Sequence, residues 1–148
     1  MLWVLPLALL LSACSSFGSL TDQGPDVRRT STEITIYRDN GGKLGNYYMD
    51  FIAASKTDQR VRLDGDCVSA CTMILGLGDR VCATPHARLG FHKVREADGR
   101  TISTGGTAML RAMYPSSVQA WFDTHVTDDP NPVYMTSAEV SHYVRSCR

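Results

Sequence analysis

The sequence predicts an α/β fold in which a small, mostly parallel sheet is flanked by helices. Residues 33–37 (Glu-Ile-Thr-Ile-Tyr) are rich in β-branched side chains, which favour a strand. After the turn-forming residues 38–42, apolar side chains recur at the spacing of an amphipathic helix: Leu44, Tyr47, Tyr48, Phe51 and Ile52. Val61 and Leu63 then alternate with two arginines, as in a second strand. Strand, helix and strand in this order predict a βαβ unit, whose strands are parallel.

The rest of the chain continues in short strands and helices. Gly65 is expected to end the second strand through a positive φ, and Ser69 to cap the helix that follows. Residues 76–79 should stop that helix. The other predicted elements are an extended segment over 26–32, strands over 80–84 and 88–92, a polar loop over 93–106, and helices over 108–113, after Pro115 and from the capping box that begins at Thr136.

The composition indicates one folded domain and argues against nucleic acid as a partner. A chain of 148 residues with a 43% hydrophobic share can form one globular core, and a charged share of 20% is too low for a disordered chain. Lys+Arg and Asp+Glu are both 15, so the formal net charge is zero. There is no basic excess of the kind that binds a phosphate backbone.

The first 14 residues have the pattern of a bacterial lipoprotein signal peptide. Residues 2–11 are apolar apart from Pro6, with the length of a signal-peptide core and too short to span a bilayer. They lead into Leu-Ser-Ala-Cys, which resembles the lipobox, whose cysteine (here Cys14) is lipidated and becomes the new N-terminus. No Lys or Arg precedes the apolar run, which departs from the signal pattern. The alternative is a buried N-terminal helix.

Processing at Cys14 implies three segments and a location. Residues 1–14 would be the signal peptide, residues 15–31 a flexible tether, and residues 32–148 the folded domain. The resemblance implies a lipid anchor in the bacterial cell envelope, with the domain facing the periplasm. Ser15 in place of Asp after the cysteine favours the outer membrane, again by resemblance to bacterial lipoproteins.

Four cysteines remain after such processing: Cys67, Cys71, Cys82 and Cys147. In an oxidising periplasm an even number of cysteines predicts two disulfides, with three possible connectivities. We favour Cys71–Cys82 and Cys67–Cys147, because the helix start and the next strand are expected to be neighbours. A zinc site built on the Cys67/Cys71 spacing is the weaker alternative, since zinc knuckles use tighter pairs. We expect no metal and no cofactor.

The order of three small motifs points to an active site. A Gly41-Gly42 turn follows a strand, Ser69 stands at a strand-to-helix turn, and His92 ends a strand 23 residues later. This order resembles the proteolytic subunit of Clp protease and its wider superfamily, which includes the crotonases and signal peptide peptidases. Further similar strings are the Pro-His-Ala-Arg turn at residues 85–88 and the helix start at residues 134–139, so the resemblance covers roughly residues 34–144.

The resemblance implies a serine hydrolase that transfers acyl groups, with a peptide or protein as substrate. Ser69 would be the nucleophile and His92 the base, and the backbone N–H groups of Gly41, Gly42 and Ala70 would bind the oxyanion. The remaining histidines, His86, His125 and His142, are interpreted as structural or surface residues.

The sequence departs from the family in three respects. The family's first strand and helix are missing or shortened, so the resemblance does not extend to barrel-shaped oligomers or to an unfoldase partner. Two cysteines flank Ser69. The aspartate that orients the base is absent before Tyr134, where Asn131 stands instead; Asn131, Asp128, Asp129 or no third residue would complete the site.

Two other functions remain open at this point. One is an inactive binding or scaffold lipoprotein on the same fold, because a fold does not determine an activity. The other is thiol chemistry at Cys67 or Cys71. A fluorophosphonate probe tests the first alternative, and a count of free thiols tests the second.

Overall fold

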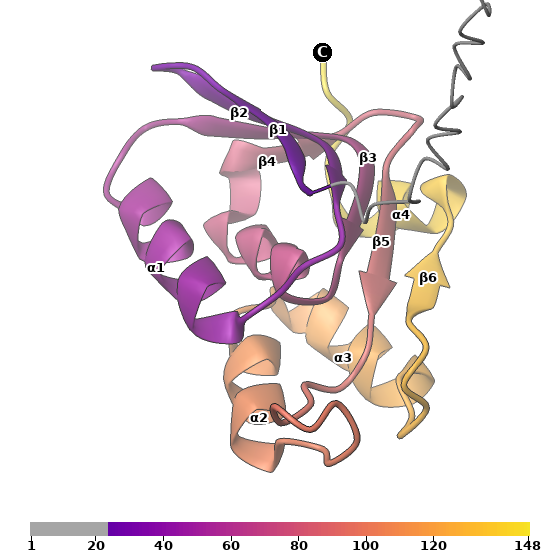
Figure 1. The fold of residues 1–148 in the computed structure, drawn as a ribbon. Helices are drawn as coiled ribbons and strands as arrows, with labels where there is room; N and C mark the ends of the chain where they lie inside the picture. Colours follow the sequence, from indigo (N-terminus) through magenta and orange to yellow (C-terminus); the bar gives the residue numbers. More distant parts are fainter. Residues whose placement is uncertain (1–23) are drawn as a thin grey trace, which may run out of the picture.

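The computed structural model describes residues 24–148, which form a mixed α/β fold (Figure 1). The six-stranded sheet has the order β1-β2-β3-β5-β6, and β4 pairs with β3 beside this path. The strands are β1 (Asp26–Arg29), β2 (Glu33–Asp39), β3 (Arg60–Val68), β4 (Val81–Ala83), β5 (Arg88–Phe91) and β6 (Val133–Met135). The pairings of β3 with β2, β4 and β5 are parallel, whereas β1–β2 and β5–β6 are antiparallel. The predicted α/β class is therefore confirmed, with a parallel centre and antiparallel outer strands.

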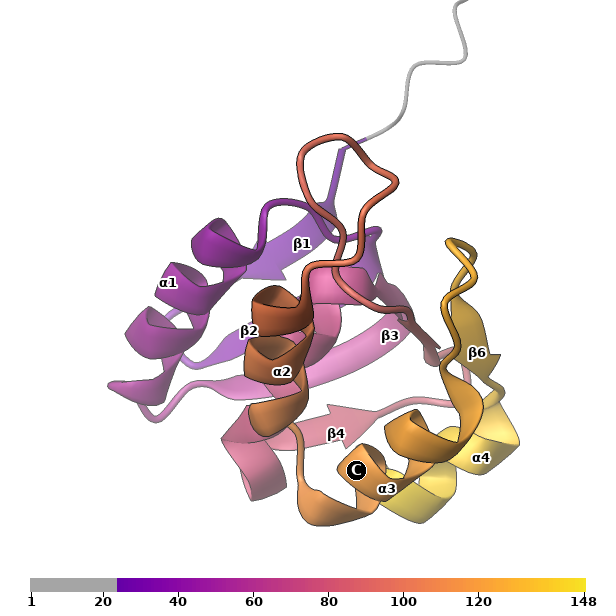
Figure 2. The same cartoon turned by 90° about the horizontal axis from the view of Figure 1, so that it is seen from below.

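The predicted βαβ unit is present as β2, α1 (Leu44–Ser55) and β3. The other helices are the 3₁₀-helix η1 (Ser69–Arg80), α2 (Thr104–Ala112), α3 (Ser116–His125) and α4 (Ser137–Tyr143). Figures 1 and 2 show α1 at one side of the molecule and α3 and α4 at the other, with α2 between them. The capping box of α4 is confirmed, because the Thr136 and Glu139 side chains each accept a hydrogen bond from the other residue's backbone N–H.

Strand β3 is longer than its sequence predicts, because Gly65 does not end it. A Cβ at Gly65 would lie 1.9 Å from the carbonyl oxygen of Tyr37, and the β2–β3 register shifts between Ile36 and Arg38. Gly65 thus permits a close approach of two backbones inside the sheet, and the expected positive φ is wrong. The strand continues to Val68 and delivers Ser69 directly to the start of η1.

One strand and one helix start were missed, and the extended segment predicted over 26–32 contains a strand. Strand β1 lies within residues 15–31, the predicted tether, so the end of that segment belongs to the sheet. Strand β6 has only three residues and pairs with β5, which its short sequence does not indicate. Helix α2 begins at Thr104, where Ser103 caps it by accepting a hydrogen bond from the Gly106 N–H.

Parallel pairing brings three strand ends to one edge of the sheet. Asp39 at the end of β2 lies opposite Cys67, and Val68 at the end of β3 lies opposite Gly90 in β5. The residues that follow these ends are the glycine turn (residues 40–42), Ser69 and His92. The carboxyl edge of a parallel sheet is where α/β proteins commonly bind ligands.

Aromatic side chains of the core pack against the end of β5 and fix this edge of the sheet. Phe91, the last residue of β5, is fully buried and packs edge-on against Tyr114, with ring centroids 5.5 Å apart. Trp121 and Phe122 of α3 contact the same ring at centroid distances of 5.1 and 6.4 Å. Because Phe91 is fixed on several sides, the backbone position of His92 is fixed with it.

Candidate active site

A cavity of about 360 Å³ opens at this carboxyl edge. Its walls include Gly41, Gly42, Ser69, Ala70 and His92. The structure therefore places in one cavity the residues predicted as nucleophile, base and oxyanion donors. Asn131 does not line this cavity.

The backbone of Ser69 is in the left-handed region, with φ 58°. Ser69 is the one non-glycine residue with a positive φ between residues 24 and 148. Such a conformation costs about 1–3 kcal/mol and persists only where the surroundings enforce it. It also corrects the predicted capping role, because the N-cap of η1 is Val68 and no side chain caps the helix.

Gly41 packs directly against this turn. It has φ 79°, and a Cβ on it would lie 2.7 Å from the Val68 oxygen and 2.8 Å from Ser69 Cβ. Both the positive φ and the contact require glycine at this position. The glycine turn is consequently in van der Waals contact with the backbone that carries the Ser69 hydroxyl.

Asp39 organises the glycine turn from the buried side, and the sequence analysis missed it. Its Oδ1 accepts hydrogen bonds from the Gly41 N–H at 2.9 Å and from the Tyr47 hydroxyl at 2.5 Å. Burial, together with the hydrogen bond to Asp39, raises the pKa of Tyr47. An Asp two residues before a glycine is the pattern of an Asx-turn, and this was the available signal.

The same hydrogen bond changes the assignment of the oxyanion donors. The Gly41 N–H already donates to Asp39, so it is not free to bind an oxyanion. Gly42 is exposed beside the cavity, and Ala70 is in the first turn of η1, where backbone N–H groups lack partners within the helix. Gly42 and Ala70 are the two donors that the geometry leaves available.

His92 is half-buried, and its Nδ1 lies 2.7 Å from the carbonyl oxygen of Lys93. A carbonyl oxygen only accepts hydrogen bonds, so Nδ1 carries the proton of the neutral ring. Nε2 is then the unprotonated nitrogen, which is the one a base needs. Within residues 24–148 the Ser69 hydroxyl makes no hydrogen bond, to His92 or to any other group.

In the part of the chain that the structure describes, none of the predicted third residues forms a hydrogen bond or ion pair with His92. The backbone N–H and Nδ2 of Asn131 donate to Asp129 Oδ1 at 2.8 and 2.9 Å. These two side chains therefore bond to each other within a local turn. Asp128 pairs with Lys93, whose Nζ lies 2.5 Å from Oδ1, and this hydrogen bond lowers the pKa of Asp128. The Lys93 carbonyl takes the place expected for Asn131.

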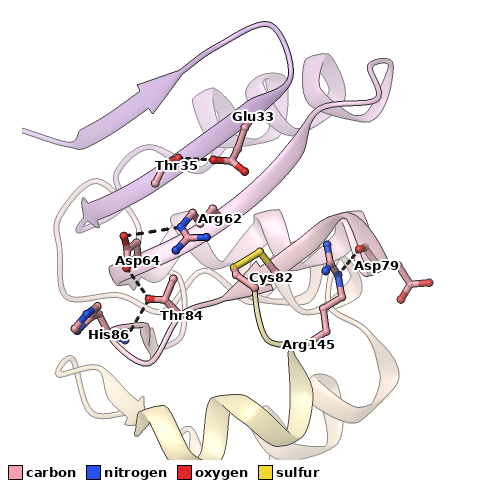
Figure 3. Close-up of a disulfide and its surroundings, with 10 residues drawn as sticks. Glu33, Thr35, Arg62, Asp64, Asp79, Cys82, Thr84, His86 and Arg145 are labelled. Carbon is pink, nitrogen blue, oxygen red and sulfur yellow. Dashed lines mark hydrogen bonds and ion pairs between the residues drawn. A yellow bond between two sulfur atoms is a disulfide. The ribbon is translucent and has the colours of Figure 1, made fainter.

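All four cysteines are in disulfides, but the favoured connectivity is wrong. The pairs are Cys67–Cys71, with a Cα–Cα distance of 5.4 Å, and Cys82–Cys147, with 4.9 Å. Ser69, which has a positive φ, lies between the two cysteines of the first pair, so Cys71 is bonded to the strand that precedes it and not to the next strand. Cys147 meets Cys82 because Ala83 of β4 exchanges backbone hydrogen bonds with Arg145 and Cys147. Figure 3 shows the disulfide at Cys82, with Arg145 nearby.

Disulfide formation leaves no thiolate on these cysteines for metal binding or thiol chemistry. Among residues 24–148 no group of three or more metal-ligating side chains is present. His125 stacks on Trp121 with centroids 4.5 Å apart, while His86 and His142 are exposed away from the cavity. No helix in this part of the chain is long and apolar enough to cross a bilayer. Cys14 and the predicted signal peptide lie outside the described residues.

Comparison of the chain with models of protein families and with curated proteins found no match in either case.

Proposed function

We propose that this chain is a serine hydrolase that performs peptidase-like acyl transfer, with Ser69 as nucleophile and His92 as base. The fold would be built of βαβ units like those of the Clp protease and crotonase superfamily. The observation that carries the proposal is the left-handed Ser69 at a strand-to-helix turn, in the same cavity as His92. Backbone strain of this kind concentrates at functional sites.

The proposed reaction follows from the proton positions. Ser69 Oγ attacks the carbonyl carbon of an ester or peptide while its proton passes to Nε2 of His92. The N–H groups of Gly42 and Ala70 bind the oxyanion, each donor contributing about 10²–10³ in rate. The imidazolium then protonates the leaving group, and a water activated by His92 releases the acyl group from Ser69.

The Lys93 carbonyl would orient the imidazole in place of a carboxylate. It keeps Nδ1 protonated throughout the reaction, so Nε2 is the nitrogen that accepts the proton and returns it. A neutral carbonyl stabilises the imidazolium less than a charged carboxylate does, so we expect a slower enzyme than one with an aspartate at this position. The hydrogen bond between Ser69 and His92 would form in the substrate complex, since catalytic contacts are commonly loose without substrate.

The location is proposed together with the activity. Processing at Cys14 would leave the domain attached to the bacterial envelope, in the outer membrane and facing the periplasm. The two disulfides support an oxidising compartment. A peptide or protein of the envelope would then be the substrate.

A fluorophosphonate probe tests the activity, because it reacts covalently with an activated serine. Wild-type protein should be labelled, and Ser69→Ala and His92→Ala should not. Ser116→Ala, which removes an exposed serine at the start of α3, is the matched control and should be labelled as wild type. An unlabelled wild type that is folded by circular dichroism would contradict the proposal.

The second candidate is an inactive binding or scaffold lipoprotein. The absence of a hydrogen bond to the Ser69 hydroxyl within residues 24–148 favours it. A wild type that resists the probe but binds a peptide in the same cavity, with binding lost when Gly42→Trp fills the cavity mouth, would support this candidate.

A further inference from the structure

The disulfide Cys67–Cys71 encloses Ser69, two residues from each cysteine. Cys67 is in β3, where it lies opposite Leu89, and its side chain is fully buried. Cys71 is in the first turn of η1 and is 3% exposed. Both ends of the five-residue segment are therefore held by secondary structure, and the chain must turn sharply within it.

A second restraint acts on the same residue from the helix side. The buried Thr72 hydroxyl donates to the carbonyl oxygen of Ser69 at 2.6 Å. Thr72 in turn lies 2.7 Å from the Tyr114 hydroxyl, which must supply the proton of that bond. These contacts hold the carbonyl of Ser69, while the disulfide limits the torsions of the residues on both sides of it.

We propose that the Cys67–Cys71 disulfide is a positioning element that holds Ser69 in its left-handed conformation, so that the site is competent only while this bond is oxidised. An L-residue leaves the left-handed region when nothing enforces it. Opening the ring would allow Ser69 to relax to a negative φ and carry its hydroxyl away from the His92 side of the cavity. The catalytic part of this inference rests on the proposed function of Ser69.

The second disulfide provides a contrast within the same chain. Cys82–Cys147 closes a loop with a sequence separation of 65, against 4 for Cys67–Cys71. A longer loop restricts the unfolded chain more, so Cys82–Cys147 should contribute more to global stability. It joins β4 to the C-terminal segment, and neither cysteine lines the cavity.

The redox step is an exchange of two electrons. Two thiols lose two electrons and two protons as the S–S bond forms, and a disulfide of a small thiol or of an oxidoreductase accepts them. The buried sulfurs restrict attack by a reductant on the folded protein. The site would accordingly become competent once, during oxidative folding.

The first experiment measures the coupling between the disulfide and the Ser69 backbone without any activity. Glycine tolerates a positive φ and alanine does not, so Ser69→Gly should fold more favourably than Ser69→Ala, by roughly fivefold in the folding equilibrium constant. This Gly/Ala ratio of folding equilibrium constants should fall to about one or below when both substitutions are made in the Cys67→Ala/Cys71→Ala background. It should persist in the Cys82→Ala/Cys147→Ala background. If the first background does not fold, Cys67→Val/Cys71→Val restores the buried volume.

The second experiment measures the rate and the affinity of fluorophosphonate labelling separately. Cys67→Ala/Cys71→Ala should lower the rate of covalent reaction roughly tenfold or more, with the reversible affinity for the probe unchanged. Cys82→Ala/Cys147→Ala should lower Tm more but keep the rate. If the disulfide acted only through general stability, the labelling rate would instead fall in proportion to the loss of Tm in both double variants.

The outcomes separate the two proposals. A Gly/Ala ratio that is unchanged without Cys67–Cys71 overturns the positioning role whatever the activity is. A ratio that collapses in a protein that the probe never labels supports the backbone role and contradicts the hydrolase. Full labelling rate without Cys67–Cys71 overturns the catalytic part of the inference.

Discussion

Nδ1 of His92 donates a hydrogen bond to the carbonyl oxygen of the very next residue, Lys93, at 2.7 Å. Because Lys93 follows His92 directly in the chain, this hydrogen bond can orient the imidazole without a partner from a distant loop. The side chain of Lys93 meanwhile reaches the loop of residues 127–132 through Asp128. The loop that was expected to orient the base is thus bound to Lys93, and within residues 24–148 it makes no hydrogen bond to the ring.

Asn131→Ala should leave fluorophosphonate labelling within about threefold of wild type, because the Asn131 amide bonds to Asp129. His92→Ala should lower the labelling rate by about 10²–10⁴, the range for loss of a general base. The second-order labelling rate of purified, folded protein measures both. A loss with Asn131→Ala as large as with His92→Ala would show that the amide, and not the Lys93 carbonyl, orients the ring.

Asp39→Ala should destabilise the fold by about 1–3 kcal/mol, because the Gly41 N–H and the Tyr47 hydroxyl both lose their acceptor. Asp39→Asn keeps one acceptor oxygen and should cost less. Tyr47→Phe removes only the hydroxyl that donates to Asp39, so it measures the contribution of that hydrogen bond apart from that of the Gly41 N–H. Urea unfolding measures the changes; equal stability of Asp39→Ala and wild type would mean that this side chain does not hold the glycine turn.

Digestion with trypsin, without reduction, should reveal the connectivity directly. Cleavage after Arg62 and Arg80 releases residues 63–80, which should carry the Cys67–Cys71 bond within one peptide, two hydrogens lighter than the dithiol. Residues 81–88 should be found joined to residues 146–148 through Cys82 and Cys147. A mass for residues 63–80 joined to residues 81–88 would contradict this pairing.

Tyr114→Phe should reduce the loss of stability at alkaline pH. Burial raises the pKa of Tyr114, so the folded protein keeps its proton above about pH 10 while the unfolded chain releases it. Wild type then loses about 1.4 kcal/mol of stability per pH unit through this residue, and the variant does not. Near neutral pH the variant should be about 1 kcal/mol less stable, through the lost bond to Thr72.

Thr72→Val is the control for this pH dependence. It removes the hydrogen bond to Tyr114 but keeps the buried phenol, so the alkaline slope of the free energy of unfolding should stay as in wild type. Urea titrations between about pH 8 and pH 11, a range that brackets the ordinary tyrosine pKa, would give the slope of the free energy of unfolding against pH for each protein. Identical slopes for Tyr114→Phe and wild type would contradict the raised pKa.

Cys14→Ala should release the protein from the membrane fraction, since the lipid would be attached to that sulfur. Ser15→Asp should keep the anchor and shift the protein from the outer to the inner membrane fraction, by resemblance to bacterial lipoproteins. Fractionation and immunoblotting of the two variants would separate these effects. A Cys14→Ala protein that remains with the membrane would refute lipidation at this residue.

The elements with strong local signals were predictable from the sequence. Alternation around Leu63, the helical spacing from Leu44 to Ile52 and the capping box at Thr136 are confirmed as β3, α1 and α4. In each case the signal arises within one element, from the period of its buried side chains or from a bond to a near neighbour. The order of these elements also predicted the α/β class.

The sequence by itself determined that the glycine turn, Ser69 and His92 each follow a strand, and that the cysteines pair. The tertiary structure decided the rest, because those features depend on contacts between segments distant in the chain. Gly65 continues a strand since Tyr37 of β2 lies against it, and β6 exists since β5 is beside it. The Cys67–Cys71 pairing occurs together with a positive φ at Ser69, which no local propensity of serine favours and which the folded surroundings impose. The Cys82–Cys147 pairing needs the C-terminal segment to lie beside β4.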